Sequence, residues 1–284
     1  MSQSDSQPAG DLAGKVAWIS GATSGIGTAA ARLFVAHGGK VVMVGRRGEL
    51  ARSLAAEIDR SGSKAMGMPC DVANAQQVAD SIAETVRTFG RLDIIVNNAG
   101  MVDVLPLHEY DDERWDRVMG VNVKSMFLAF KAAYPHLKAA GRGYVVNVGS
   151  ISSFVGQRGT PVYTTTKHAI LGLTRSIALD YAIDGIRCNC VCPGITDTPM
   201  LREHLNSNPD PDGMLAQRLQ RVPMNIALTP DDVARSIKYF ACEDSAGVTG
   251  TSLTVDGGYL TAAEWTCEEP TAFSQGASTT PDNA

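Results

Sequence analysis

Two kinds of segment alternate along this chain from about residue 15 to residue 255. Short runs rich in Val and Ile lie at residues 15–20, 40–44, 65–70, 92–97, 144–149, 186–191 and 252–256. Between them, apolar residues recur at helical spacing over residues 26–37, 49–60, 75–89, 112–138, 161–182 and 231–240. Several short runs are apolar at consecutive positions, as in parallel strands that are covered on both faces. The alternation therefore predicts an α/β fold, a doubly wound parallel sheet with helices on both faces.

The charge balance excludes one class of function. The chain has 25 Lys and Arg against 30 Asp and Glu, a formal net charge of -5, so no cationic field is available to bind nucleic acid. No run approaches the roughly 18 apolar residues of a membrane helix, and the first residues lack the basic and apolar regions of a secretory signal. We therefore expect a cytoplasmic protein. Charged residues make up 19% of the chain, below the usual value of about 25%, which suggests that part of the surface faces a partner.

Two segments depart from the alternation. Residues 198–228 resemble two short helices around an Asn/Pro/Asp/Gly turn, too long for an ordinary connection. We interpret them as a lid over a site, with a passive surface insertion as the alternative. Residues 265–284 are rich in Ser, Thr, Pro and acidic residues, which predicts a disordered tail or one that packs against a neighbouring subunit. With a flexible N-terminus over residues 1–11, one domain spans residues 12–261.

Three of the six cysteines alternate within one predicted strand. Cys188, Cys190 and Cys192 fall at strand period, which places them on one face. No further ligand at metal spacing is nearby, so we expect buried small side chains and no metal or redox site.

A glycine-rich turn, residues 20–27, follows the first predicted strand and leads directly into the first helix. Glycines permit a tight turn and close approach of the backbone to a pyrophosphate, and the helix N-terminus directs free N–H groups toward it. Plain turn geometry also selects Gly, but the position between first strand and first helix favours dinucleotide binding.

The end of the second predicted strand bears on the choice of dinucleotide. An NAD-binding domain usually places Asp or Glu here to hold the ribose 2′-hydroxyl. This chain has Gly45, followed by Arg46 and Arg47, and Arg46 offers a charged fork for a 2′-phosphate. NADP(H) is therefore favoured, with NAD(H) possible. The alternative is that both arginines are merely solvated at a strand end.

Tyr163 and Lys167 are spaced i and i+4 near the start of a predicted helix, so they share one face. A free phenol ionises near pH 10, too high for acid-base work near neutrality. A positive charge about 4 Å away stabilises a phenolate by roughly 4 kcal/mol at an effective dielectric of about 20. Many helices carry such a pair by chance, so the pattern is weak when taken alone.

Two further polar residues fall at informative positions. Ser150 follows the fifth predicted strand, at the sheet edge where this fold binds ligands, and its hydroxyl either donates to a substrate oxygen or caps a local turn. Asn122 lies at i+7 from Trp115 and i+3 from Met119, and so shares their predicted apolar face. A buried amide must find partners, which fits a structural and a catalytic role equally well.

Taken together, these motifs resemble the short-chain dehydrogenase/reductase family over about residues 12–261. The resemblance rests on Gly21-xxx-Gly25-x-Gly27, Asn97-Asn98-Ala99-Gly100, Asn122, Ser150, Tyr163-xxx-Lys167 and Pro193-Gly194. It implies a single Rossmann-type domain with a seven-stranded parallel sheet, assembled as a homotetramer. It also implies that Tyr163 is the general acid-base, that Lys167 stabilises the phenolate and holds the ribose, that Ser150 binds substrate oxygen, and that Asn122 positions a water for proton relay.

The same resemblance implies where the cofactor binds. The expected contacts are Gly21, Thr23, Ser24, Gly25, Ile26, Gly27, Arg46, Asp71, Val72, Asn98, Gly100, Tyr163, Lys167, Pro193, Gly194, Thr196 and Thr198. Within this set, the pair after the third strand is expected at the adenine, Asn98 and Gly100 beside the ribose, and the two threonines near the nicotinamide carboxamide.

The chain departs from the family pattern at three positions. Ser20 stands where the family usually has Thr, a change that keeps the hydroxyl. Thr196 replaces an aliphatic residue at a position that acts largely through its backbone. Ser24 is not the basic residue of some NADP-preferring members, so the predicted preference rests on Arg46.

The resemblance implies reversible hydride transfer between a nicotinamide and a secondary alcohol or ketone of a small molecule. The alternatives are a 3-oxoacyl thioester reductase, a binding protein that has lost its chemistry, and an epimerase. The expected substrate contacts are Ser150, Ser152, Gln157 and Tyr163. The predicted wall of the substrate pocket also includes Phe154, residues 101–105, Met200, Leu201 and His204. This mostly apolar wall suits small ketones, polyols or ring alcohols. His204 and His108 are predicted to be surface or lid contacts and not bases.

Overall fold

The computed structural model describes residues 10–206 and 209–262. Seven strands form one parallel sheet in the order β3-β2-β1-β4-β5-β6-β7, which confirms the predicted doubly wound fold. The strands are β1 (Val16–Ser20), β2 (Lys40–Gly45), β3 (Ala65–Pro69), β4 (Ile94–Asn97), β5 (Gly143–Val148), β6 (Ile186–Pro193) and β7 (Ser252–Val255). The strand order reverses between β1 and β4, and a sheet of this kind binds ligands at such a switch point, beyond the carboxyl ends of its strands.

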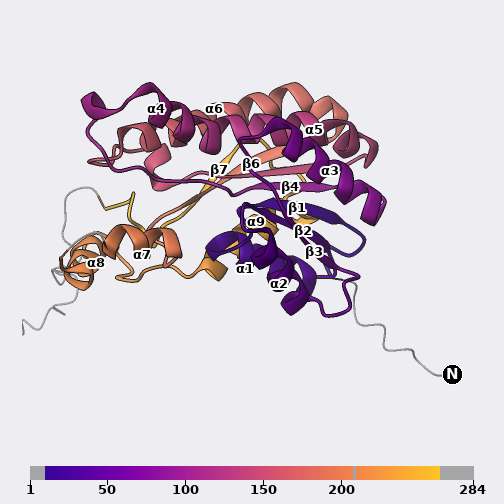
Figure 1. Ribbon diagram of the computed structural model, residues 1–284, viewed down its shortest axis with the longest axis horizontal. Helices are drawn as coiled ribbons and strands as arrows, with labels where there is room; N and C mark the ends of the chain where they lie inside the picture. Colours follow the sequence, from indigo (N-terminus) through magenta and orange to yellow (C-terminus); the bar gives the residue numbers. More distant parts are fainter. Residues whose placement is uncertain (1–9, 207–208, 263–284) are drawn as a thin grey trace, which may run out of the picture.

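The helices connect successive strands. The longer ones are α1 (Gly25–Ala36), α2 (Gly48–Ile58), α3 (Ala75–Phe89), α4 (Asp112–Met119), α5 (Ser125–Ala139), α6 (Pro161–Tyr181), α7 (Pro199–Asn206), α8 (Pro211–Leu219) and α9 (Pro230–Phe240). Five short helical segments are η1 (Leu107–Glu109), η2 (Gly120–Lys124), η3 (Ile151–Ser153), η4 (Ala182–Asp184) and η5 (Glu243–Ser245). Helices α1, α2 and α9 lie on one face of the sheet, and α3, α5 and α6 lie on the other (Figure 1).

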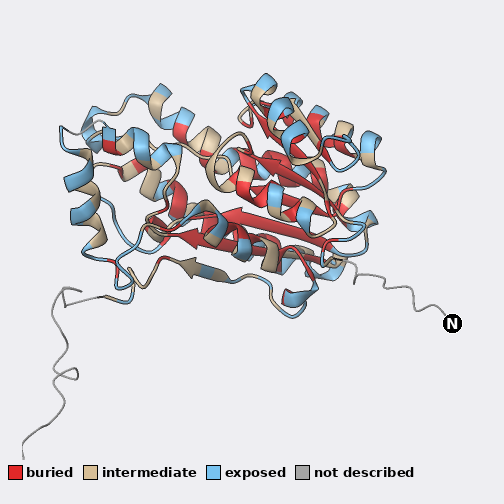
Figure 2. Ribbon diagram, turned by 90° about the horizontal axis from the view of Figure 1, so that it is seen from below, coloured by how far each residue is buried: buried red, intermediate tan, exposed pale blue. Residues whose placement is uncertain are grey.

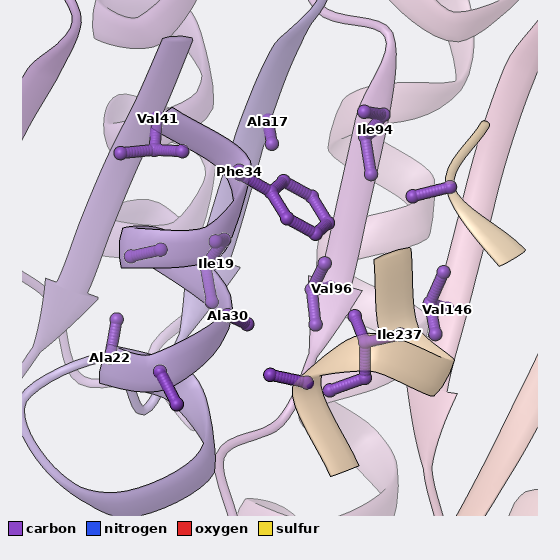
Figure 3. Close-up of a cluster of buried hydrophobic side chains, with 14 of the residues drawn as sticks. Ala17, Ile19, Ala22, Ala30, Phe34, Val41, Ile94, Val96, Val146 and Ile237 are labelled. Atoms are coloured by element: carbon purple, nitrogen blue, oxygen red, sulfur yellow. The ribbon is translucent and has the colours of Figure 1, made fainter. Parts of the chain in front are cut away.

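The sheet separates two hydrophobic cores. One packs Phe34 of α1 and Ile237 of α9 against Ile19, Val96 and Val146 of the central strands (Figure 3). The other packs α3, α5 and α6 against the opposite face of the same strands. The central strands are therefore buried on both faces, while the outer faces of the helices are exposed (Figure 2). This explains why the strand sequences are continuously apolar and do not alternate.

The helix predicted over residues 112–138 is interrupted. Helix α4 ends at Met119, the π-helical turn η2 follows, and α5 begins at Ser125. Trp115 is 36% exposed and Asn122 is fully buried, so the two do not share a buried face as predicted. A π turn inserts one extra residue into the helical repeat, and such turns are frequent at functional sites.

Helices α7 and α8 confirm the two short helices predicted within residues 198–228, and they lie together to one side of the sheet (Figure 1). Both ends of this segment are held at its base. The N–H of Asp197 donates to the carbonyl of Leu228 and the N–H of Leu228 donates to that of Ile195, each at 2.8 Å. Met224 donates from its N–H to the carbonyl of Gly257, beyond β7. The segment therefore stands on a fixed base.

The tail predicted for residues 265–284 and the first nine residues of the predicted flexible N-terminus lie outside the described residues. Gly10 and Asp11, also assigned to that flexible segment, are packed in the fold. The Asp11 carboxylate pairs with Lys238 and His37, and Leu12 is fully buried beside it. None of the helices described here is both long and apolar enough to cross a membrane.

Candidate active site

The glycine-rich turn lies at the switch point and depends on three glycines. Gly21 and Gly25 have φ values of 63° and 54°, in the left-handed region that favours Gly. A Cβ on Gly27 would lie 2.5 Å from the carbonyl oxygen of Gly21 and 2.6 Å from Nδ2 of Asn98. The turn is therefore closed so tightly that only hydrogen fits inside it.

The start of α1, just after this turn, has free N–H groups. Ser24 is the N-cap in an extended conformation, but its side chain makes no capping hydrogen bond, and the first turn of α1 has no acidic residue. The first N–H groups of a helix have no partner within the helix, and together with the helix dipole they form a site for an anion. This cradle fits the pyrophosphate of a dinucleotide.

The turn is tied to the end of β4 through Ser20 and Asn98. The Ser20 hydroxyl donates to the carbonyl of Val96 and accepts from the N–H groups of Asn98 and Ala99 at 3.0 Å. Asn98 Nδ2 donates to the carbonyls of Ser20 and Gly21 at 3.0 and 3.1 Å. Ser20 thus keeps the hydroxyl function expected at this position, and the Asn98 side chain holds the turn.

The two arginines after β2 have different surroundings. Arg47 donates from Nη2 to the hydroxyl and carbonyl oxygens of Thr23, at 3.3 and 3.5 Å. Arg46 is exposed, and within the described residues its guanidinium has no hydrogen bond or ion pair. A Cβ on Gly45 would lie 2.8 Å from Cγ2 of Thr23, so a carboxylate-bearing side chain at this position would displace the turn. The contact of Arg47 with Thr23 was not predicted.

Tyr163 and Lys167 lie together on α6, with the Lys167 Nζ 5.4 Å from the centre of the Tyr163 ring. Lys167 is 5% exposed and donates to the carbonyl of Val148 at 2.9 Å, its one hydrogen bond among the residues that the structure describes. A buried ammonium has three N–H donors and is costly to leave unpaired. Two donors thus remain for a ligand at the end of β5.

Ser150 follows that strand end and is the N-cap of η3. Its hydroxyl oxygen accepts from the N–H of Ser152 at 3.1 Å, while its own N–H donates to Ser153 at 3.2 Å. Both sequence interpretations of Ser150 are therefore compatible, because the cap uses the oxygen and leaves the hydroxyl proton for a ligand. Ser152, by contrast, is 2% exposed and donates to Oε1 of Gln157 at 2.9 Å. Of this predicted pair of substrate contacts, only Gln157 is exposed.

Asn122 is fully buried within η2, and its amide is satisfied on both sides. Oδ1 accepts from the N–H of Met101 at 2.8 Å, and Nδ2 donates to the carbonyl of Met101 at 2.9 Å and to Oγ1 of Thr166 at 3.0 Å. Gly100 lies beside it, because a Cβ there would be 3.6 Å from Asn122 Oδ1 and 3.9 Å from Lys167 Nζ. The sequence did not indicate Thr166 or the clamp on Met101.

The remaining predicted cofactor contacts follow the ends of β3 and β6. Asp71 accepts from the N–H of Ala73, and Val72 is 7% exposed. Gly194 packs so closely on Asp256 that a Cβ would lie 2.8 Å from its Cα. Thr198 lies over the glycine-rich turn, with Cγ2 3.1 Å from a Cβ built on Gly25. The end of β6 therefore adjoins the start of α1. The rest of this group is Pro193 at the end of β6 and Thr196, which is 7% exposed.

Two segments of the predicted substrate wall contact each other. Leu105 donates from its N–H to the carbonyl of Gly159 at 3.0 Å, so residues 101–105 meet the segment after η3. Val104 and Phe154 are 51% and 40% exposed on these two segments, as an apolar wall requires. Met200 of α7 is 39% exposed, and Leu201 is half-buried beside it. Ile26, a predicted cofactor contact, is half-buried at the start of α1 and packs against the core on that face of the sheet.

The two histidines lie on η1 and on α7. His108 is exposed beside Glu109. The Arg218 guanidinium of α8 donates to Nε2 of His204 on α7. Burial, and secondarily the charge of Arg218, lower the pKa of His204.

The cysteines of β6 lie on one face of the sheet. Cys188, Cys190 and Cys192 are fully buried, and the Sγ atoms of the last two are 3.6 Å apart. Burial raises the pKa of the Cys188 thiol. Among the residues described, no three His, Cys, Asp or Glu side chains form a group able to hold a metal.

Comparison with known proteins identifies the relatives of this chain. A family model described as enoyl-(acyl carrier protein) reductase matches residues 21–260. The chain is 39% identical over 249 residues to the 2-(R)-hydroxypropyl-CoM dehydrogenase of Xanthobacter autotrophicus, covering 86% of this chain and 98% of that enzyme. Its structure resembles the aldohexose dehydrogenase of Thermoplasma acidophilum with a TM-score of 0.81 and 32% identity, over 90% of this chain and 98% of that one.

A second solved structure bears on the cofactor. It is a Beutenbergia cavernae protein with bound NADP at low occupancy, similar with a TM-score of 0.82 and 32% identity, over 88% of this chain and 98% of that one. The fold, the glycine-rich turn at its switch point and the similarity along nearly the whole chain lead to one conclusion. This chain belongs to the short-chain dehydrogenase/reductase family of Rossmann-type NAD(P)-dependent oxidoreductases.

Proposed function

We propose that this protein transfers a hydride reversibly between a nicotinamide dinucleotide and the secondary alcohol or ketone carbon of a small molecule. One observation supports this above the others. Lys167 is buried below the Tyr163 ring, with two ammonium hydrogens unpaired among the described residues, next to the strand end that carries Ser150. A positive charge beside the ring would stabilise the phenolate that remains when Tyr163 gives up its proton.

The residues present fit a dinucleotide. The pyrophosphate would be held by the free N–H groups at the start of α1, and the closed glycines of the turn leave room for its approach. The unpaired donors of Lys167 suit ribose hydroxyls. When bound, the nicotinamide supplies or accepts the hydride.

The side chains of the protein would handle the proton. In reduction, the hydroxyls of Ser150 and Tyr163 donate hydrogen bonds to the carbonyl oxygen and so stabilise the charge that develops there. Tyr163 then gives its proton to that oxygen, and the ammonium of Lys167 stabilises the phenolate that remains. Asn122 would position a water through which the proton is replaced, and an oxygen of Asn122 would hold it, because both amide hydrogens already have partners. Oxidation uses the same groups in reverse.

The cofactor is proposed to be NADP(H), because the end of β2 carries no carboxylate and Arg46 is free to pair with a 2′-phosphate. Gly45 supports the same choice, since the space for a longer side chain is filled by Thr23. NAD(H) is the alternative. The substrate is proposed to be a small ketone, polyol or ring alcohol, given the exposed apolar side chains of Val104 and Phe154 and the exposed amide of Gln157.

A substrate panel tests the function. Secondary alcohols, ketones, polyols and a 3-oxoacyl thioester are assayed by nicotinamide absorbance, with NAD(H) and NADP(H) separately. We expect turnover with a ketone or alcohol and little with the thioester, which is the alternative. Turnover of the thioester alone would overturn the proposed substrate class.

The role of Tyr163 has its own test. Tyr163→Phe is expected to lower kcat by about 10²–10⁴-fold, as for the loss of a general acid-base, and to leave dinucleotide binding unchanged. The matched control is Tyr181→Phe, the same change at the last residue of α6, which should keep wild-type turnover. Wild-type turnover in Tyr163→Phe would remove Tyr163 from the mechanism.

A further inference from the structure

Thr166 joins two elements that carry candidate catalytic side chains, α6 and η2, and through Asn122 it reaches the loop after β4. We propose that it is a positioning residue, whose hydroxyl fixes Asn122 and the loop after β4 against the turn of α6 that carries Tyr163 and Lys167. The inference rests on the proposed function, because positioning has a meaning only if these side chains react.

Two hydrogen bonds of the fully buried Thr166 Oγ1 carry this inference. It donates to the carbonyl of Tyr163 at 2.6 Å and accepts from Nδ2 of Asn122 at 3.0 Å. The hydroxyl therefore links the backbone of one candidate residue to the side chain of another. The residue after Thr166 is Lys167, so the same helical turn carries both members of the pair.

Asn122 extends the link to the exit of β4. Its Oδ1 accepts from the N–H of Met101 and its Nδ2 donates to the carbonyl of Met101, which is the pair of hydrogen bonds that a neighbouring strand would make. Gly100, just before, adjoins both side chains, since a Cβ built on it would lie 3.6 Å from Asn122 Oδ1 and 3.9 Å from Lys167 Nζ. A rotation of the Asn122 amide would therefore move the chain that passes beside the ammonium.

The position of Asn122 makes such a constraint useful. It lies in the π turn η2, where the regular helical hydrogen-bond pattern is interrupted. The Thr166 hydroxyl supplies an anchor from a different helix, which is regular at that point. Small displacements matter in catalysis, since a misplacement of about 1 Å can cost about 10²-fold in rate.

The protein contains a matched control on the same helix. Thr174 is 1% exposed, donates from Oγ1 to the carbonyl of Ile170 at 2.8 Å, and accepts from Nδ2 of Asn147 at 2.9 Å. Asn147 is fully buried on β5 and accepts from Asn97 at 2.8 Å. Thr174 thus has the same type of bonds to a buried amide, but that amide belongs to the sheet interior and not to the candidate site.

The test compares Thr166→Val, Thr166→Ser and Thr174→Val as full-length protein. Each is measured for dinucleotide binding, thermal unfolding, kcat and KM. Turnover is normalised to the fraction of protein that binds dinucleotide. If the added methyl prevents folding of Thr166→Val, Thr166→Ala takes its place, with the same expectation.

Thr166→Val is expected to lower kcat by about 10–100-fold with little change in KM, because orientation and not affinity is lost. Thr166→Ser should restore kcat to within a few-fold of the wild type. Thr174→Val should lower the unfolding temperature to a similar extent but keep wild-type kcat.

Three results would overturn the inference. They are wild-type kcat in folded Thr166→Val, an equal loss of kcat in Thr174→Val, and a serine variant as slow as the valine one. Wild-type turnover is established first, so failure of the proposed function appears as inactivity of every form. Failure of this inference appears as an active Thr166→Val.

Discussion

Two neighbouring arginines at the end of β2 differ in what they touch, and the difference separates two contributions to cofactor binding. Arg47 holds Thr23 of the glycine-rich turn, so it supports the part of the site that any dinucleotide uses. Arg46 is exposed and unpaired among the described residues, so its charge is free for a ligand. The sequence indicated Arg46 as the phosphate contact but not the bond from Arg47 to Thr23, because that bond depends on how the end of β2 packs against the turn.

Arg46→Ala is therefore expected to weaken NADPH binding by about 10–100-fold, the effect of losing a charge-assisted hydrogen bond of about 1.5–3 kcal/mol, and to leave NADH binding unchanged. Arg47→Ala should weaken both dinucleotides by the same, smaller factor, because it loosens the turn. Titration of the bound nicotinamide fluorescence measures all four affinities. Equal effects of Arg46→Ala on NADPH and NADH would contradict the assignment of Arg46.

At the level of elements, the segment of α7 and α8 combines a fixed base with a partly buried contact between a guanidinium and an imidazole. His204 of α7 and Arg218 of α8 join the two helices, and burial is the main cause that lowers the pKa of His204. The unfolded chain binds a proton at His204 more readily than the folded chain. Folding stability therefore falls as pH drops through the ordinary histidine range near about 6.5.

Arg218→Met should raise the pKa of His204 toward its ordinary value without reaching it, because burial, the larger cause, remains. Histidine ring signals in an NMR pH titration measure this, with His204→Gln to assign the signal. Arg202→Met is the control, since Arg202 belongs to α7 but pairs with the exposed Asp197. An unchanged pKa in Arg218→Met would show that the guanidinium does not act on His204.

Among the elements, the π turn η2 is the one that the apolar periodicity of the sequence did not predict. Val118, Asn122 and Met126 are all buried at a spacing of four residues, which a regular helix and a helix with one inserted residue satisfy equally. Apolar periodicity reports which face is buried, and it is insensitive to a single extra residue in one turn.

For the whole molecule, the starts of the central strands, at the opposite end of the sheet from the site, depend on a buried carboxylate. Asp93, 0% exposed, accepts from the N–H of Val16 on β1 at 2.9 Å and pairs with Arg91. The N–H of Tyr144 on β5 donates to the main-chain carbonyl of Asp93. Asp93 therefore ties together the three central strands at their starts, while the site is built at their ends. The homotetramer implied by the family resemblance stays a prediction.

Asp93→Ala is expected to lower the free energy of unfolding by about 2–4 kcal/mol, because it leaves a buried N–H and a guanidinium without their acceptor. Chemical denaturation measures this. Glu84→Ala is the control: its pair with Arg87 lies on the surface, and it should cost less than about 1 kcal/mol. Activity per folded molecule should be retained in Asp93→Ala, and a loss of stability no greater than in the control would refute the role of Asp93.

The sequence by itself determined the parallel sheet, its seven strands, the dinucleotide turn and the identity of Asn122, Ser150, Tyr163 and Lys167 as candidates. These follow from local pattern, because strand burial, tight turns and helical spacing are properties of neighbouring residues. Only the tertiary structure decided which arginine holds the turn, that Ser152 is buried, and that Thr166 joins Asn122 to α6. Such contacts connect residues that are remote along the chain, and side-chain direction is set by packing between elements, which no local pattern encodes.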